Sequence, residues 1–177
     1  MIPESLAEIV PVRLAEPLAP AVAAERAGVR IDVDDLVERA REKARRVDLL
    51  LLEGAGGLLV PLAPARTTLD LVAALGATVL VVAGNRLGVI NHTLLAVERL
   101  AAANVPIVGV VLNRLGSSAG LAESLNPGSL ERLLGPRYLG ELPWLGDRAD
   151  AASAAAALSR TIDLDDLWRT LATSPAR

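Results

Sequence analysis

Short apolar runs alternate with amphipathic helical stretches along most of this chain, and this alternation restricts the possible folds most strongly. Three such runs are "TVLVVAG", "PIVGVVLN" and "YLGELP", and helical patterns separate them. Continuous apolar runs of this length are typical of strands buried on both faces, as in parallel sheets. The order of strands and helices therefore predicts the α/β class, with a three-layer, mainly parallel sheet that carries helices on both faces.

The expected elements follow from periodicity and from capping residues. A first helix is expected from Pro20 to about Gly28, and a second over residues 32–47, where apolar side chains share one face. The run "DLLLLE" at 48–53 is expected to be a buried strand. The remaining pattern predicts a helix at 67–76 capped by Thr67 or Thr68, a strand at 78–84, a helix at 88–105, a strand at 106–113, a helix at 126–135 with Pro127 in its first turn, a strand at 138–143, and helices near 151–158 and 164–172.

The composition favours one soluble globular domain over residues 1–177. With 177 residues, 52% hydrophobic and 22% charged, the chain can bury a sizeable core. A net charge of -3 leaves no basic surface, so nucleic acid is not an expected partner. The absence of cysteine excludes disulfides, thiolate metal sites and cysteine nucleophiles.

No segment of the sequence is typical of export or of membrane insertion. The start, "MIPESLAEIVPVRL", lacks a basic stretch followed by an apolar one. The longest apolar stretch, "LVAALGATVLVVAG", is too short to span a bilayer. A cytoplasmic location without membrane contact is the expectation.

The predicted strands end in polar or glycine-rich residues, which marks one edge of the sheet as a ligand site. In open α/β sheets, ligands bind at the carboxyl ends of the strands. Four strand exits are expected there: Glu53 with its glycines, Gly84-Asn85-Arg86, Asn113-Arg114 and Glu141-Leu142-Pro143.

The exit "EGAGG" has two interpretations. A carboxylate at Glu53 can hold Mg²⁺, and the glycines let backbone N–H groups approach phosphate oxygens. The alternative is a turn with a solvated acid. The dinucleotide fingerprint G-x-G-x-x-G fails, because Leu59 stands where the third glycine belongs.

The other exits also allow a binding role and a purely structural one. The stretch "RLGVINHT" can open a helix whose free N–H groups receive an anion, with Arg86 adding charge, or Asn91 can simply cap that helix. The spacing alone favours the cap. Asn113 can read an adenine edge or make an Asx turn, and the turn is favoured. Backbone around Pro143 can line a base pocket or form an ordinary turn.

A phosphate-binding P-loop, G-x-x-x-x-G-K-[ST], would normally complete such a site. The sequence does not contain it. Lys43 is the only lysine and lies in the middle of a predicted helix, so no variant of the motif that keeps the lysine is present either.

The chain resembles the dethiobiotin synthetase family. The matching stretches are "AEPLAPAVAAERAG", "LLLLEGAGGLLVPL", "RLGVINHTLLAVERL", "PIVGVVLN" and "LGELPWLG", in the order of the family, from about Leu14 to Trp144. The resemblance implies a P-loop NTPase-like fold and an ATP- and Mg²⁺-dependent ring closure of 7,8-diaminopelargonic acid with CO2 to dethiobiotin, in biotin synthesis. It also implies a homodimer.

The resemblance assigns binding roles but no catalytic residue. Glu53 takes the place of the family's Mg²⁺-ligating glutamate. The helix start after Arg86 would receive the substrate's carboxylate tail, in preference to a simple cap at Asn91. ATP contacts are implied for Gly54, Ala55, Gly56, Asn113, Leu142, Pro143 and Trp144, and substrate contacts for Arg86, Gly88, Val89, Ile90 and Asn91.

The sequence departs from the family at its start and at single positions. The family's P-loop strand, which lies in the middle of its sheet, would precede the "AEP" region, and this chain begins just before that region. Arg86 stands where some members have lysine, and Ala21 where histidine is usual. An N-terminally shortened synthetase of this kind is expected to be inactive or weak by itself.

Three alternatives remain. The chain can be a non-catalytic relative that serves as a binding or dimerisation module, or one half of a split enzyme whose P-loop is on another polypeptide. Other P-loop amide-forming or partition ATPases are a more distant alternative, because they do not explain "LGVINH".

Overall fold

The computed structural model describes residues 5–173, and the chain divides into two compact units, Met1–Gly76 and Ala77–Arg177. Each unit has its own helices and strands, and each is described by itself below. The single domain expected over residues 1–177 stays a prediction. Within the described residues, no helix is long and apolar enough to cross a membrane.

The first unit is mainly helical, with one small hairpin. The helix at Pro20 ends at Gly28, whose φ of 64° is the left-handed conformation typical of a helix C-terminus. Asp32 caps the next helix by accepting hydrogen bonds from two backbone N–H groups of its first turn. The elements are α1 (Leu6–Ile9), α2 (Pro20–Ala27), α3 (Val33–Ala44), β1 (Pro61–Ala63), β2 (Arg66–Thr67) and α4 (Thr68–Leu75).

Helices α3 and α4 pack together, and polar contacts bind the two ends of this pair. Arg41 of α3 donates to the backbone carbonyl of Ala74, 2.8 Å away, at the C-terminal end of α4. Arg66 pairs with Asp34 at 3.0 Å near the start of α3. Thr67 caps α4 as predicted and forms a reciprocal capping box with Asp70.

The segment 48–53 is not a strand, which corrects the prediction of a buried strand there. These residues are irregular, and Leu51 is 81% exposed. A strand is stable only when its backbone N–H and C=O groups pair with a neighbouring strand. Among the described residues no strand pairs with this segment, so its apolar character alone does not produce strand structure.

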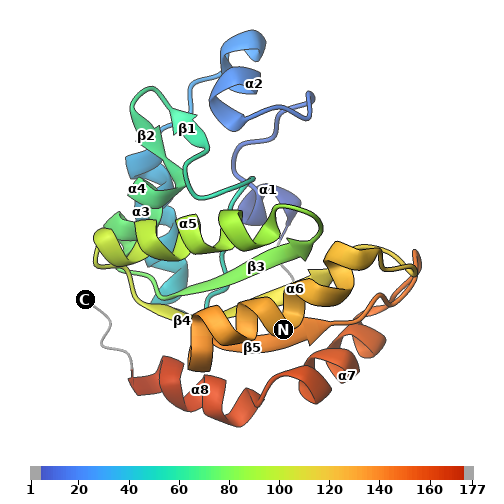
Figure 1. Ribbon diagram of the computed structural model, residues 1–177. Coiled ribbons are helices and arrows are strands. Elements are labelled where there is room, and N and C mark those ends of the chain that lie inside the picture. Colours follow the sequence, from blue (N-terminus) through green and yellow to red (C-terminus); the bar gives the residue numbers. More distant parts are fainter. Residues whose placement is uncertain (1–4, 174–177) are drawn as a thin grey trace. The chain divides into compact units, whose positions relative to one another are not determined.

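The second unit is an α/β layer structure built on a parallel sheet (Figure 1). Its three strands lie in the order β3-β4-β5, and all neighbours are parallel. This confirms the predicted α/β class with a parallel sheet and flanking helices. The elements are β3 (Val79–Asn85), α5 (Val89–Ala102), β4 (Ile107–Arg114), α6 (Leu121–Leu134), the 3-10 turn η1 (Gly135–Arg137), β5 (Tyr138–Leu142), α7 (Ala151–Thr161) and α8 (Leu164–Thr173).

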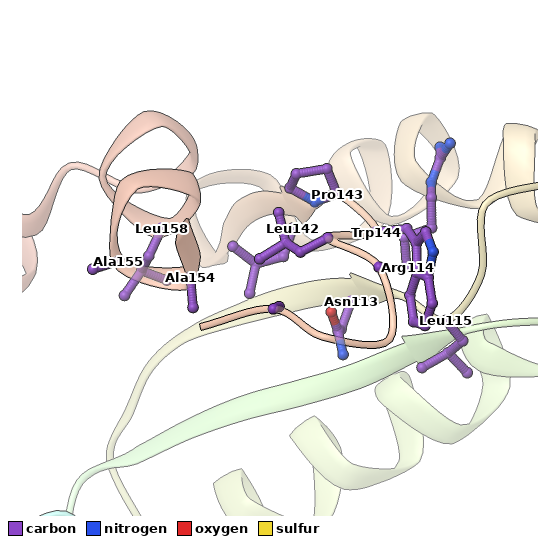
Figure 2. Close-up of a pocket in the computed structure, with 12 residues that line it drawn as sticks. Asn113, Arg114, Leu115, Leu142, Pro143, Trp144, Ala154, Ala155 and Leu158 are labelled. Atoms are coloured by element: carbon purple, nitrogen blue, oxygen red, sulfur yellow. The ribbon is translucent and has the colours of Figure 1, made fainter. Parts of the chain in front are cut away.

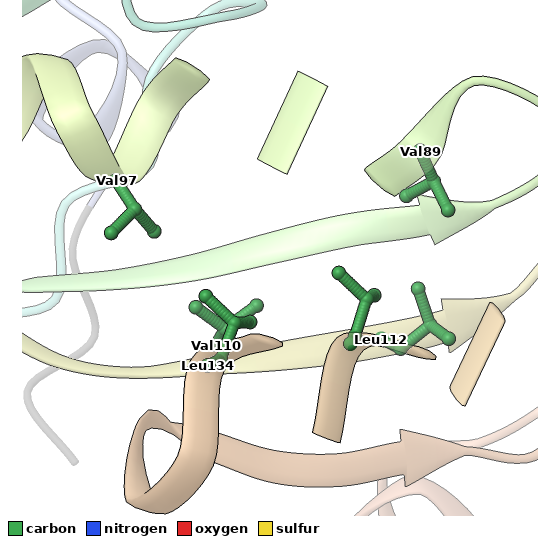
Figure 3. Close-up of a cluster of buried hydrophobic side chains, with 6 residues drawn as sticks. Val89, Val97, Val110, Leu112 and Leu134 are labelled. Atoms are coloured by element: carbon green, nitrogen blue, oxygen red, sulfur yellow. The ribbon is translucent and has the colours of Figure 1, made fainter. Parts of the chain in front are cut away.

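Helices cover both faces of the central strand β4. Val110 and Leu112 pack with the buried side chains of α5 and α6 (Figure 3). Val111 points to the opposite face because side chains alternate along a strand. Its neighbour on β5, Gly140, faces Thr161 of α7, whose methyl group would lie 2.9 Å from an added Cβ. The central strand is therefore buried on both sides, which explains its unbroken apolar sequence.

Helix α6 begins at Leu121, so the prediction of a start near Asn126 with Pro127 in the first turn is wrong. Pro127 lies inside the helix. Proline has no N–H, so it leaves the carbonyl of Glu123, four residues earlier, without its helical partner. The side-chain amide of Asn85 donates to that carbonyl at 2.8 Å. A side chain from the end of β3 thus replaces the missing backbone donor and lets the helix continue through the proline.

Candidate nucleotide site at the carboxyl edge of the sheet

Three of the four predicted strand exits meet at one edge of the sheet. The parallel register places Asn85 beside Arg114 and Asn113 beside Leu142. The predicted site residues of these exits therefore lie together in the second unit. Glu53 and its glycines belong to the first unit and are described separately below.

A pocket of about 470 Å³ lies beyond the ends of β4 and β5 (Figure 2). Its lining includes all four residues predicted to border adenine in this part of the chain: Asn113, Leu142, Pro143 and Trp144. The other walls come from Arg114, the last residue of β4, from Leu115 after it, from the turn after β5, and from Ala154, Ala155 and Leu158 of α7. Most of this lining is apolar, as is usual for small-molecule sites.

The wall formed by α7 and by Arg114 and Leu115 was not predicted. The alanine-rich sequence of α7 gave no chemical signal, but small side chains leave the space that the pocket occupies. Arg114 directly follows Asn113 and was noted only as part of a strand exit. Its charge next to a predicted base-binding amide is the signal that could have identified it.

A buried polar network lies between the strand ends and helix α6, and its centre is Asn85, only 3% exposed. Asn85 Nδ2 donates to Glu141 Oε1 at 2.7 Å, and Asn85 Oδ1 accepts from Asn126 Nδ2 at 2.8 Å. Asn126 also donates to the carbonyl of Arg86 at 3.2 Å. With the bond to the Glu123 carbonyl, the amide of Asn85 has a partner for each donor and for its oxygen, as burial of a polar group requires.

Glu141 connects this network to Arg114. Its Oε2 accepts from Arg114 Nη2 at 3.1 Å, and its Oε1 lies 3.4 Å from Arg114 Nε. The same carboxylate lies near Tyr138, where burial chiefly, and then the charges of Glu141 and Glu131, raises the pKa of the phenol to about 12. Tyr138 therefore stays neutral at physiological pH.

The loop after β3 opens helix α5 with backbone groups available for an anion. Gly88 occupies the cap position with a φ of 91°, which favours glycine, and no side chain caps this helix. Asn91 lies inside the first turn, so the alternative in which it caps the helix is wrong. The Val89 N–H donates to the Arg86 carbonyl, whereas no described residue accepts from the N–H groups of Ile90 and Asn91.

The glycine-rich loop of the first unit is exposed and closely tied to the start of α4. Gly56 has a φ of 89°, and an added Cβ would also lie 3.1 Å from Val60. At Gly54 an added Cβ would lie 3.0 Å from the methyl group of Thr68. The backbone N–H groups of Thr68 and Leu69 donate to the carbonyls of Val60 and Leu58. These contacts fix the loop conformation from its C-terminal side.

Glu53 is exposed and forms no ion pair or hydrogen bond with any described residue. Among the residues that the structure describes, no group of three acidic or histidine side chains could hold a metal ion. A single exposed carboxylate nevertheless fits Mg²⁺, which proteins usually hold with one or two carboxylates together with water and substrate phosphates.

Comparison with known proteins identifies the family of this chain. A protein family described as "AAA domain" matches residues 1–152. The ATP-dependent dethiobiotin synthetase BioD of Anaeromyxobacter dehalogenans strain 2CP-C is 46% identical over 151 residues, which cover 85% of this chain and 68% of that protein. The chain belongs to the dethiobiotin synthetase family.

Further relatives support the same family. The dethiobiotin synthetase of Anaeromyxobacter sp. strain K is 45% identical over 84% of this chain and 67% of its own length. That of Nitrosospira multiformis is 41% identical over 77% of this chain and 60% of its own length. The chain thus spans about two thirds of the dethiobiotin synthetases it matches. These matches confirm the family that the sequence motifs predict, and they favour it over a non-catalytic module.

Proposed function

We propose that this chain supplies the nucleotide- and substrate-binding part of a dethiobiotin synthetase, which closes the ureido ring of dethiobiotin from 7,8-diaminopelargonic acid, CO2 and ATP. The observation that carries the proposal is the pocket at the carboxyl edge of β4 and β5. In a member of this family, a pocket lined by Asn113, Leu142, Pro143 and Trp144 is a suitable place for the adenine base.

The pocket suits a purine in size and in chemistry. Leu142, Pro143 and Trp144 offer an apolar surface against which a flat ring can pack. The amide of Asn113 carries both donors and an acceptor, which matches the donor and acceptor edge of adenine. Base binding would therefore depend on packing for affinity and on Asn113 for selectivity.

The start of α5 is the proposed site for the carboxylate tail of the substrate. The N–H groups of Ile90 and Asn91 and the positive end of a 14-residue helix favour a negative charge there. Arg86 adds a cation in the same loop. Gly88 and Val89 would contact the tail through their backbone, so binding here fixes the end of the substrate remote from its amines.

Glu53 is the proposed ligand of Mg²⁺, and Gly54, Ala55 and Gly56 are proposed to lie along the nucleotide phosphates. The positive φ of Gly56 and the tight space at Gly54 support backbone approach rather than side-chain contact. Bound Mg²⁺ would neutralise phosphate charge during transfer of the γ-phosphoryl group. Glu53 would hold that ion with its carboxylate.

In the proposed reaction, one amine of the substrate takes up CO2 as a carbamate, ATP phosphorylates the carbamate, and the second amine displaces phosphate to close the ring. The residues of this chain would hold the base, the phosphates and the carboxylate tail in fixed positions, which lowers the entropy cost of the reaction. We further propose a cytoplasmic homodimer, and contacts to the γ-phosphate from a P-loop segment outside these 177 residues. The chain by itself would then turn over slowly or not at all.

Thermal unfolding of the full chain tests nucleotide binding. Mg·ATP at about 100 times its Kd should stabilise the folded chain by about 2.7 kcal/mol, whereas Mg²⁺ alone should have little effect. Trp144→Ala should reduce this stabilisation, and Trp168→Ala on α8, outside the pocket, should leave it unchanged. Equal unfolding temperatures with and without millimolar Mg·ATP would contradict the proposal.

A further inference from the structure

The turn that opens α5 has no packed side chain of its own. It consists of Arg86, Leu87 and Gly88, all three of which are exposed, and Leu87 is 83% exposed. The residues on either side, Asn85 and Val89, are buried, with 3% of each exposed. The conformation of the turn between these two anchors therefore depends on hydrogen bonds to its backbone.

The carbonyl of Arg86 accepts two such bonds. The Val89 N–H donates to it at 3.1 Å and closes the turn, and Asn126 Nδ2 donates to it at 3.2 Å. A carbonyl oxygen has two lone pairs, so both donors can be accommodated. Asn126 belongs to α6, 40 positions along the chain, so the second bond ties the turn to a different element of the unit.

The amide of Asn126 is itself held in place by buried groups. Asn126 is 6% exposed, and its Nδ2 also donates to Asn85 Oδ1 at 2.8 Å. Asn85 is fixed in turn by its own bonds to the carbonyl of Glu123 and to Glu141 Oε1. The Nδ2 group that donates to the turn therefore has a direction set by the surrounding network.

The same turn determines where the first free N–H groups of α5 point. Its bond from Val89 and the left-handed conformation of Gly88 lead into the helix, and the N–H groups of Ile90 and Asn91 follow without an acceptor in the described part of the chain. An anion at a helix N-terminus needs these groups aimed at one place. A turn that shifts would change their direction and weaken binding of the anion.

We propose that Asn126, oriented by Asn85, is a positioning residue that holds the turn before α5 in the form that binds the carboxylate tail of the substrate. This inference deepens the proposed tail site and rests on it. Asn126 would act through the Arg86 carbonyl and without contact to the ligand.

Binding of 7,8-diaminopelargonic acid and of its methyl ester to the full chain, measured by calorimetry, tests the proposal. The ester keeps both amines but lacks the negative charge, so the comparison reports on the tail site. Asn126→Ala should weaken binding of the acid by about tenfold, the range expected for a disturbed hydrogen bond to a charged group, and should leave binding of the ester unchanged. Leu134→Ala, at a buried core residue of the same helix, is the matched control that destabilises α6 without touching the turn, and it should leave both Kd values unchanged.

The possible failures are distinguishable. An unchanged Kd for the acid in Asn126→Ala would overturn the positioning and leave the proposed tail site intact. An equal loss for acid and ester, or the same loss in Leu134→Ala, would show a general effect of destabilisation and would also overturn it. Equal binding of acid and ester by the unaltered chain would refute the tail site, and the positioning with it.

Amide hydrogen exchange of the ligand-free chain gives a second test that does not depend on any ligand. The Val89 N–H should exchange roughly fivefold faster in Asn126→Ala, relative to the N–H of the fully buried Leu100 in the same helix. In Leu134→Ala the two amides should change by the same factor. An unchanged ratio in Asn126→Ala would refute the role of Asn126 in holding the turn.

Discussion

Residues 49–53 and residues 79–85 form an informative pair, because both are apolar runs that end in a polar side chain. The second run is strand β3, whose seven residues all have partners on β4. The first is irregular, and Leu51 projects almost fully into solvent. The two runs are similar in composition. They differ in whether a neighbouring strand forms hydrogen bonds with their backbone N–H and C=O groups.

This difference also separates the two halves of the proposed site. The pocket proposed for adenine and the helix start at α5 lie on elements that the sheet holds together in the second unit. Glu53, by contrast, follows a segment that no sheet supports. We therefore expect side-chain positions at the pocket to be insensitive to changes in the glycine loop, and the following predictions test that contrast in order of decreasing effect.

Truncation of the sheet core should have the largest effect. Leu130 of α6 is fully buried against β4, so Leu130→Ala should lower the free energy of unfolding by about 2 to 5 kcal/mol. Leu133→Ala on the same helix, at a 57% exposed side chain, is the matched control. Urea unfolding gives both values, and a comparable loss at Leu133 would contradict the packing described for α6.

Loss of the Asn85 amide should have the second-largest effect on the free energy of unfolding. Asn85→Leu leaves the carbonyl of Glu123 without a donor, removes the 2.7 Å donor to Glu141 Oε1 and takes the acceptor from Asn126 Nδ2, and should cost about 1 to 3 kcal/mol. Pro127→Ala restores a backbone N–H to the Glu123 carbonyl, so it should reduce this cost in the double variant. Strict additivity in urea unfolding would show that Asn85 does not compensate for the proline.

Loss of the capping box of α4 should have a smaller effect. Thr67→Ala should cost about 1 kcal/mol, and Thr67→Ser, which keeps the hydroxyl, should cost much less. Hydrogen bonds from the side chain and then the backbone of Thr67 lower the pKa of Asp70 below its usual value of 3.8. The stabilisation that the ionised Asp70 gives through these bonds is therefore present above pH 3.8 and is lost as the pH falls through the lowered pKa. The difference in free energy of unfolding between the alanine and serine variants should therefore become smaller in acid.

Substitution in the unsupported run should have the smallest effect. Leu51→Ala should change the free energy of unfolding by less than about 0.5 kcal/mol, because the side chain is exposed and packs on little. Val81→Ala, in the apolar run of β3, should lower the free energy of unfolding by more than this, since Val81 packs against the core cluster. A large loss at Leu51 would show that residues 49–53 are buried and paired in solution.

Much of the second unit could be predicted from the sequence, because its signals are local. Strands β3, β4 and β5 have continuous apolar runs. In the first unit, Thr67 and Gly76 likewise mark the ends of α4 by their cap chemistry. Part of the pocket lining, Asn113, Leu142 and Pro143, could be predicted as well, since parallel strands bring their carboxyl ends to one edge.

The remaining features depend on contacts between residues far apart in the chain. Asn85 bonds to Asn126 and Glu141, which lie 41 and 56 positions away, and an asparagine read by itself indicates only a turn or a cap. The same distant contact allows Pro127 inside α6, where proline ordinarily marks a helix start. The short elements α1, β1 and β2 were also missed, because two to four residues carry too little periodicity to predict.

The central claim is that the carboxyl edge of the sheet binds the base of ATP. Photolabelling tests this claim most directly. The full chain would be irradiated with 8-azido-ATP and Mg²⁺, and the labelled peptide identified by mass spectrometry. We predict that the label falls within residues 113–158, that excess ATP prevents it, and that excess GTP prevents it less. Labelling elsewhere in the chain, or labelling that ATP does not reduce, would contradict the account.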